Sequence, residues 1–397
     1  MLKFSIIGAG AAGNKALAGL IESGYPEEYC CFLNSTRKDI PEKYQEAALI
    51  FGKGLGGCGK ERSLGKSMLL EDLQKETINL DTCIPINDSN AIIIVGSCEG
   101  GSGSASIPIL AKYYNEVYDK PVIVVLFFGF RDDVRGIQNT IEIVQELSED
   151  YTVIGIDNSK FLNLTNMNRF KAEKAANKKF NEIVKLLMGG DILPGEQIID
   201  DTDLFKIIST PGYMVCDAVQ LPVRIKTMDE FNDAIYNAIN SHPFVDPPKD
   251  AGPKRMGLIF NVTAIEDTID YRAPQLNALY GDPYELFISL GISDQDNEFF
   301  YIVSGMRFPI DEVTRIYKEY LERSEKVVKS RDTFFDTISE FRGNNDDAQF
   351  DMLSPRQSTP SKVGKKNFFA DFGIKDFKSG DKIVNTGVID KDSEADY

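Results

Sequence analysis

The sequence is poor in the residues that build many catalytic and metal sites. Its 397 residues include a single histidine, His242, so neither a histidine-based metal site nor a Ser-His-Asp triad can form. The six cysteines show no C-x-x-C spacing, and we interpret the chain as a reduced, cytosolic protein.

Long apolar runs and an excess of basic charge are also missing. The longest apolar run, near residues 122–128, is far shorter than the roughly 20 residues of a membrane-spanning helix. Met1 leads directly into a strand-like segment, without the charged start and apolar core of a signal peptide. With 44 basic and 61 acidic residues the net charge is −17, so we expect no membrane partner and no nucleic-acid contact by the body of the protein.

The length and the periodicity of the chain predict its fold class. An apolar content of 42% is ample for a packed interior, and 397 residues exceed what one core usually serves. Strand-like segments alternate with helical patterns, at residues 2–7, 29–33, 91–95, 122–128 and 152–156. This alternation predicts an α/β fold with a doubly wound parallel sheet, which binds its ligand beyond the carboxyl ends of the strands.

A glycine-rich loop follows the first of these segments. Gly8, Gly10 and Gly13 form G-x-G-x-x-G between a strand and a helix, which is the dinucleotide fingerprint. A nicotinamide-dependent oxidoreductase is therefore one alternative. The fingerprint also requires a carboxylate at the end of the second strand, and here that strand ends in Asn34 instead.

Two further glycine loops favour a phosphate chain held from several sides. One lies at residues 51–60 and contains Gly54 and Gly56, and the other runs from residue 99 to residue 104 before a helix. Such a loop leaves backbone N–H groups unpaired beside the positive end of a helix dipole, where phosphate can bind. A flexible turn is the alternative for any one loop alone.

A long amphipathic helix is predicted near the middle of the chain. Between residues 170 and 188 apolar residues recur every three or four positions, lysines fill much of the rest, and Gly189-Gly190 ends the pattern. A surface helix with a solvated lysine face is the alternative interpretation.

Together these segments resemble the tubulin/FtsZ superfamily of filament-forming GTPases. The resemblance covers residues 1–215 and implies GTP or GDP with Mg²⁺ as cofactors. The implied nucleotide-binding residues are Gly8, Gly10, Ala11, Ala12, Gly13, Asn14, Asn34, Gly54, Gly56, Glu99, Gly100, Gly101, Ser102, Gly103, Ser104, Arg131, Arg135, Asn158 and Asn177. Among them, Asn177 on the central helix would read the guanine edge.

The chain departs from the family pattern around the glycine loop at residues 99–104. Ser102 replaces a threonine and keeps its hydroxyl, and Ala105 replaces a glycine. Glu99 places a carboxylate beside a phosphate site, while Arg131 stands where the family usually has an acid. A swap of charges between the two loops is therefore one hypothesis.

The resemblance also implies that hydrolysis is completed by a neighbouring subunit. Asp200 and Asp203 match two acids that reach across a filament contact, where a carboxylate can orient the attacking water. Capping of the following helix is the alternative role of these residues, since aspartate is favoured at helix N-termini.

The family comparison divides the chain into parts. We expect a nucleotide-binding domain at 1–170, a central helix at 171–188, a loop and a smaller α+β domain at 189–309, a C-terminal helix at 310–342 and a flexible tail at 343–397. Within the tail, residues 353–382 mix basic and aromatic side chains, which predicts a docking segment for a DNA-bound adaptor protein or for DNA itself, or a tail that folds on the neighbouring subunit. An inert solvated tail is the alternative.

The long C-terminal helix makes the chain most similar to the TubZ-like branch of plasmids and phages. The predicted function is thus a cytoplasmic GTPase, in a prokaryotic or phage-infected cell, that polymerises head to tail to segregate or position plasmid or phage DNA. A division-ring GTPase of the FtsZ kind is the alternative within the family.

Overall fold

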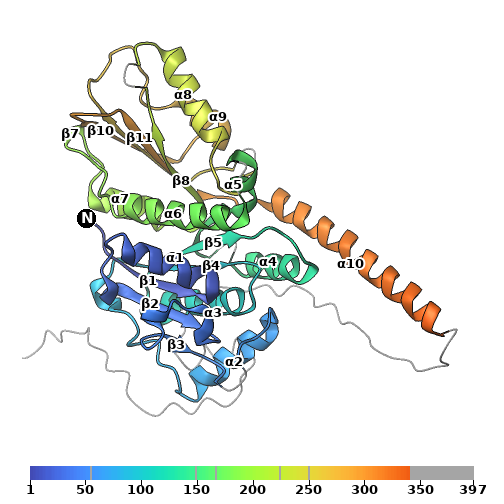
Figure 1. Cartoon of the computed structure of the whole chain (residues 1–397). Helices are drawn as coiled ribbons and strands as arrows, with labels where there is room; N and C mark the ends of the chain where they lie inside the picture. Colours follow the sequence, from blue (N-terminus) through green and yellow to red (C-terminus); the bar gives the residue numbers. More distant parts are fainter. Residues whose placement is uncertain (54–55, 148–149, 166–167, 223–224, 249–250, 340–397) are drawn as a thin grey trace, which may run out of the picture.

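A computed structural model describes residues 1–53, 56–147, 150–165, 168–222, 225–248 and 251–339 (Figure 1). Its strands are β1 (Phe4–Ala9), β2 (Cys30–Asn34), β3 (Leu49–Ile50), β4 (Ala91–Ser97), β5 (Val122–Phe128), β6 (Thr152–Asp157), β7 (Gly195–Gln197), β8 (Gly212–Gln220), β9 (Arg255–Val262), β10 (Glu285–Ile292) and β11 (Glu298–Met306). Its helices are α1 (Gly10–Glu22), α2 (Arg62–Gln74), α3 (Gly101–Tyr118), α4 (Val134–Leu147), α5 (Asn158–Thr165), α6 (Arg169–Leu187), α7 (Asp201–Ile208), α8 (Met228–Asn240), α9 (Pro274–Tyr280) and α10 (Ile310–Ser339).

The described strands form one sheet that runs through both lobes of the molecule. Its order is β3-β2-β1-β4-β5-β6-β8-β11-β9-β10-β7, and the first six strands are parallel. Only two residue pairs, Thr152 with Gly212 and Val153 with Tyr213, join β6 to β8. Beyond β8 the sheet mixes antiparallel and parallel pairs. The predicted α/β fold with a doubly wound parallel sheet and a smaller second part is confirmed.

The core explains why these segments are strands. Every residue of β1 and β5 is buried, and so is all of β4 except its last residue. Strands of a parallel sheet that is covered on both faces need such continuous apolar runs, because neither face meets water.

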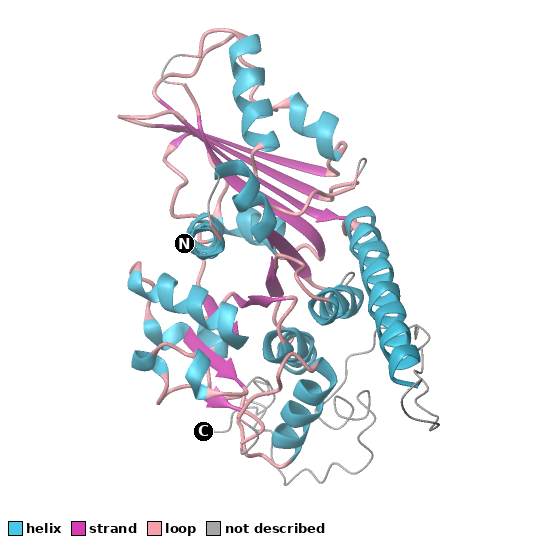
Figure 2. Cartoon of the chain, turned by 45° about the vertical axis from the view of Figure 1, so that its right-hand side comes forward, coloured by secondary structure: helices cyan, strands magenta, loops and turns pink. Residues whose placement is uncertain are grey.

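Helix α6 lies between the two lobes (Figures 1 and 2). It begins after Asn168, whose side chain accepts a hydrogen bond from the Lys171 amide at 3.0 Å, and it ends before Gly189, which has a φ of +78°. Its buried face includes Ala172, Ala176 and Phe180. The predicted central helix thus has one buried face and, on its other side, an exposed face that carries Lys171, Lys174 and Lys178.

The last described element is the long helix α10, which projects from the body in Figure 1. Residues 340–397, which include the predicted docking segment 353–382, lie outside the described residues. Among the helices that are described, none has the length and apolar character to span a bilayer.

Candidate functional site

A cavity of about 630 Å³ lies at the carboxyl ends of β1, β2, β4 and β5. This is the edge at which doubly wound sheets bind ligands, and the volume suits a nucleotide. The predicted residues that line it are Gly10, Ala11, Ala12, Asn34, Gly56, Glu99, Gly100, Gly101, Ser102, Gly103, Asn158 and Asn177. Gly54 lies outside the described residues.

Two helices begin at this cavity. Helix α1 starts at Gly10 and α3 starts at Gly101, and neither has a side-chain cap or an acidic residue in its first turn. The first N–H groups of an uncapped helix have no partner inside the helix and lie at the positive end of its dipole. Two such ends facing one cavity form a site for a polyanion.

Glycines bring the two helix starts together. Gly10 has a φ of +72°, and a Cβ on it would lie 2.7 Å from the Gly103 nitrogen. A Cβ on Gly13 would lie 2.1 Å from the Val95 carbonyl oxygen. Helix α1 therefore packs directly on β4 and on the first turn of α3, which a larger residue would prevent.

Four of the predicted residues support the cavity from behind instead of lining it. Asn14 is buried, and its Nδ2 donates to the Leu33 carbonyl at 3.2 Å. A Cβ on Gly8 would lie 2.9 Å from the Asn14 side chain, so Gly8 and Asn14 pack together. Gly13 packs on β4, and the Ser104 hydroxyl donates to the Gly100 carbonyl.

Ser102, in the glycine loop at residues 99–104, contacts the segment that follows β2. Its hydroxyl lies 2.6 Å from the Ser35 hydroxyl and 3.2 Å from the Cys58 sulfur. Ser102, Ser35 and Cys58 all line the cavity. The hydroxyl that replaces threonine is thus available at the cavity wall.

Two asparagines at this site have unpaired atoms. Asn34 Nδ2 and Asn158 Oδ1 are buried and have no hydrogen-bond partner among the described residues, although both residues line the cavity. Buried polar groups are nearly always hydrogen-bonded, so an orphan donor and an orphan acceptor here fit a polar ligand. Asn177 joins them from α6, together with Glu173.

Glu99 lies in a niche between two glycines. A Cβ on Gly129 would lie 2.1 Å from its carboxylate, and one on Gly136 would lie 3.2 Å from its Cβ. The carboxylate accepts a hydrogen bond from the Arg131 main-chain N–H at 2.7 Å. Burial raises the pKa of Glu99, because the charged form loses solvation.

The two predicted arginines do not line the cavity. The Arg131 guanidinium lies 3.1 Å from Asp157 and 2.6 Å from Glu312, and the Arg135 guanidinium pairs with Glu61 at 3.0 Å. Glu99 therefore meets the backbone of Arg131 and not its charge. Carboxylates distant in sequence compete for both guanidinium groups, which the sequence pattern could not reveal.

Lysines line the cavity instead, and the sequence analysis did not assign them. Lys15 lies on α1, Lys38 lies in the segment after β2, and Lys60 lies in the glycine loop at residues 51–60. Lys60 also pairs with Asp133 at 2.5 Å. The position of Lys15, directly after the first glycine loop, was the available signal.

The predicted catalytic acids lie away from this cavity. Asp200 caps α7, since its Oδ1 accepts hydrogen bonds from the Thr202 and Asp203 amides at 2.8 Å. Asp203 lies in the first turn of α7, 3.8 Å from Lys206. Helix α7 follows the C-terminal end of α6. That end lies about 15 Å along α6 from Asn177, at 1.5 Å per residue. Within one chain, neither acid is among the residues that line the cavity.

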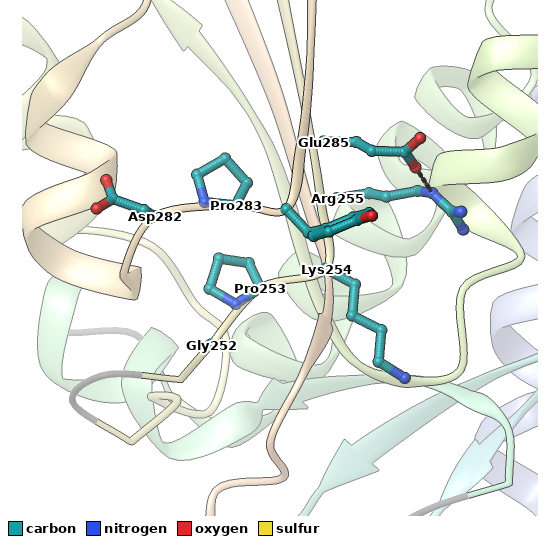
Figure 3. Close-up of a pocket in the computed structure, with 8 residues that line it drawn as sticks. Gly252, Pro253, Lys254, Arg255, Asp282, Pro283 and Glu285 are labelled. Carbon is teal, nitrogen blue, oxygen red and sulfur yellow. Dashed lines mark hydrogen bonds and ion pairs between the residues drawn. The ribbon is translucent and has the colours of Figure 1, made fainter.

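A second hollow, of about 570 Å³, lies at the starts of β9 and β10 (Figure 3). Because β9 runs parallel to β8, and β8 parallel to β6, this hollow faces the opposite end of the sheet from the cavity. Its Arg255 binds Glu285 at 2.5 Å and the Thr210 hydroxyl at 2.7 Å. The hollow therefore adjoins the end of α7.

Known proteins match the chain most clearly in the part that builds the cavity. The family described as Tubulin/FtsZ family, GTPase domain, matches residues 3–166. The tubulin-like protein CetZ3 of Haloferax volcanii is 26% identical over 144 residues, which is 33% of this chain and 36% of CetZ3. The match thus spans about a third of that relative. The cell division protein FtsZ of Methanothermobacter thermautotrophicus is 22% identical over 83% of this chain and 87% of its own length.

Solved structures share the whole fold. A GTPγS-bound protofilament of CetZ2 from Haloferax volcanii matches with a TM-score of 0.63 at 18% identity, over 82% of this chain and all of that one. A GTPγS-form protofilament of TubZ from Bacillus thuringiensis matches with a TM-score of 0.63 at 15% identity, over 83% of this chain and 94% of that one. The nicotinamide alternative has no counterpart among these matches. Residues 3–166 thus match the GTPase domain of the Tubulin/FtsZ family, and TubZ and CetZ2 are among the solved structures that share the fold of the chain.

Proposed function

We propose that the chain binds GTP in the cavity, hydrolyses it and polymerises head to tail into filaments that segregate or position plasmid or phage DNA. The observation that carries the proposal is the pair of uncapped helix starts, Gly10 and Gly101, that face one cavity of about 630 Å³. Main-chain N–H groups there would hold the phosphates, and Lys15 and Lys60 would add positive charge.

Guanine recognition falls to the asparagines in this proposal. Asn158 has a buried acceptor with no partner among the described residues, and Asn177 also lines the cavity. A guanine edge offers both donors and acceptors to such groups. Asn34, with its unpaired donor at the end of β2, would contact another polar part of the nucleotide.

Mg²⁺ would be held largely by the phosphates. Among the described residues no group of three or more Asp, Glu, His or Cys side chains could hold a metal ion. Mg²⁺ commonly binds through one or two carboxylates plus substrate phosphates and water, so a site of this kind needs no protein cage. When bound, the ion would neutralise charge on the phosphates.

Hydrolysis in this proposal needs two subunits. The cavity is at the carboxyl ends of the strands, whereas Asp201 in the first turn of α7 pairs with the Met1 amino group, just before the start of β1. Asp200 and Asp203 therefore lie toward the opposite end of the sheet. A head-to-tail contact brings opposite ends of two copies together, and such heterologous contacts generate filaments. A carboxylate from the neighbour would then orient the attacking water at the γ-phosphate. The CetZ2 and TubZ structures are protofilaments, which supports this arrangement.

The DNA role rests on the TubZ resemblance. One structural neighbour is TubZ of the Clostridium botulinum phage c-st, with a TM-score of 0.57, and the long helix α10 fits that branch. An adaptor bound to DNA would dock on residues 353–382. A division-ring role is the second candidate, because the Methanothermobacter FtsZ aligns over 83% of this chain.

The test is GTP turnover and sedimentation across a range of protein concentrations. We expect phosphate release per molecule to rise steeply above a threshold at which the protein also begins to pellet. Nucleotide binding without a threshold would leave a GTPase but refute the filament. Binding of NAD in place of GTP would refute the proposal entirely.

Mixing two impaired variants tests the shared site, at a GTP concentration near the wild-type dissociation constant, where few Asn177→Ala cavities are filled. Asn177→Ala should damage the cavity, and Asp200→Asn should remove the charge supplied to the neighbour. In a mixed filament about one quarter of the contacts join an intact cavity to an intact Asp200, so the mixture should recover about a quarter of the activity. Activity that stays at the level of the separate variants would refute hydrolysis across the contact.

A further inference from the structure

Helix α10 packs on α4 and buries Ile316, and its charged side chains also hold the loop that follows β5. The Arg131 guanidinium lies 2.6 Å from Glu312, in the first turn of α10, and 3.1 Å from Asp157 at the end of β6. Farther along α10, Arg323 donates a hydrogen bond to the Arg131 carbonyl. The Arg131 side chain is only 12% exposed, so water screens these ion pairs less than pairs on the surface.

The same loop forms part of the cavity wall. Gly129 and Phe130 line the cavity, and the Arg131 N–H donates to the Glu99 carboxylate, which lines it too. Glu99 fills the niche beside Gly129 so closely that a Cβ there would lie 2.1 Å from its oxygen. The Glu99 side chain cannot move toward this loop unless the loop moves as well.

Arg131 thus contacts both parts of the molecule. Its side chain and carbonyl hold α10, and its N–H holds Glu99. Glu99 precedes the start of α3 at Gly101 by two residues, so it stands beside the predicted phosphate site. A triphosphate brings more negative charge to this site than a diphosphate, and a nearby carboxylate opposes that charge.

We infer that Arg131 is a positioning residue that couples attachment of α10 to triphosphate binding in the cavity. The inference rests on the proposed function, since it requires a guanine nucleotide there. A triphosphate displaces Glu99, the loop at Arg131 shifts, and the contacts of Arg131 with Glu312 and Arg323 weaken. Linkage is reciprocal. The triphosphate shifts α10 toward release by a certain factor, and release of α10 must therefore raise the affinity for the triphosphate by the same factor.

The variant Glu312→Gln tests this coupling. It removes the charge that pairs with both Arg131 and Arg315, and it keeps the size of the side chain. Glu319→Gln is the matched control, because Glu319 lies on the same helix and its carboxylate contacts Arg315. Fluorescent GTP and GDP analogues are titrated into the full-length protein below the assembly threshold. We expect Glu312→Gln to raise the ratio of GTP to GDP affinity roughly fivefold over wild type, with no change for Glu319→Gln.

Hydrogen exchange of residues 310–326 gives the second measurement. In the wild type, GTPγS should speed exchange of these amides relative to GDP, and in Glu312→Gln exchange should be fast with either nucleotide. A purely structural role of the ion pair would not make exchange depend on the nucleotide.

The outcomes separate the inference from the proposed function. A wild type that binds neither nucleotide refutes both. A wild type that binds both, together with an affinity ratio for Glu312→Gln equal to or below that of the control, refutes the coupling alone. If Glu312→Gln does not fold, equal exchange of residues 310–326 with GTPγS and GDP in the wild type refutes it.

Discussion

Replacement of Gly13 by alanine should separate the packing role of the glycine loop from ordinary helix propensity. An alanine Cβ at this position would lie 2.1 Å from the Val95 carbonyl oxygen, while an ordinary contact starts near 3.4 Å. Helix α1 would have to move by about 1.3 Å, the difference between these distances, or β4 would have to yield. Overpacking of this kind costs about 1–3 kcal/mol of unfolding free energy.

Gly19 on the same helix provides the control. A Cβ at Gly19 would meet nothing within 4 Å, so Gly19→Ala should stabilise the protein by about 1 kcal/mol through helix propensity. The two substitutions are chemically identical and six residues apart on α1. Their unfolding free energies should therefore differ by roughly 3 kcal/mol, and in opposite directions from the wild type.

The assay is denaturant unfolding followed by circular dichroism, with nucleotide titration beside it. Gly13→Ala should unfold at lower denaturant and bind GTP more weakly, because the start of α1 no longer faces the cavity correctly. Gly19→Ala should unfold at higher denaturant and bind GTP as the wild type does. Equal unfolding midpoints for the two variants would show that α1 does not pack on β4 as described.

Three further predictions concern single side chains. Asp200→Asn keeps an oxygen for the Thr202 and Asp203 amides, so it should unfold as the wild type does but lose GTP turnover. Asp200→Ala also removes this helix cap, so it should in addition lose about 1 kcal/mol of stability in a denaturant titration. Full turnover by Asp200→Asn would leave Asp200 as a helix cap only. Asn177→Ala should weaken GTP binding roughly tenfold in a fluorescence titration, and Asn181→Ala, whose Nδ2 donates to the Gly19 carbonyl, should not. Equal affinities for these two variants would remove Asn177 from the site. Burial lowers the pKa of His242 from 6.5 to about 4, helped by Lys160 and opposed by Asp246, so its NMR titration should have a midpoint well below 6.5. As the pH falls, the unfolded chain takes up this proton before the folded protein does, so the unfolding free energy should fall by about 3 kcal/mol between pH 6.5 and pH 4. A flat pH profile of stability, or an NMR midpoint near 6.5, would contradict the burial of His242.

The glycine loops could be predicted because their chemistry is local. A strand, a few glycines and a helix start are contiguous in sequence, and the backbone N–H groups of such a loop suit phosphate whatever surrounds them. Twelve of the predicted residues accordingly line one cavity, from Gly10 to Asn177. The central helix was predictable for the same reason, because its apolar residues recur with the period of the helix.

The arginines show where such reasoning stops. Arg131 could meet phosphate or solvent as far as its neighbours in sequence indicate, but it pairs with Asp157, 26 residues away, and with Glu312, 181 residues away. The choice among partners depends on which carboxylate the fold brings within reach. The fold likewise decides which cations reach the cavity, and these are Lys15, Lys38 and Lys60 instead of the two arginines.

The sequence by itself determined the α/β class, the edge of the sheet that binds a ligand and the loops suited to phosphate, because each depends on residues adjacent in the chain. Only the tertiary structure decided that the cap of α7 at Asp200 lies away from the cavity and that Glu99 meets the backbone of Arg131 rather than its charge. The contact of Glu99 with Arg131 and the distance between Asp200 and the cavity both involve segments that lie far apart in the sequence. Their geometry follows from packing of the whole sheet and its helices, which no local pattern records.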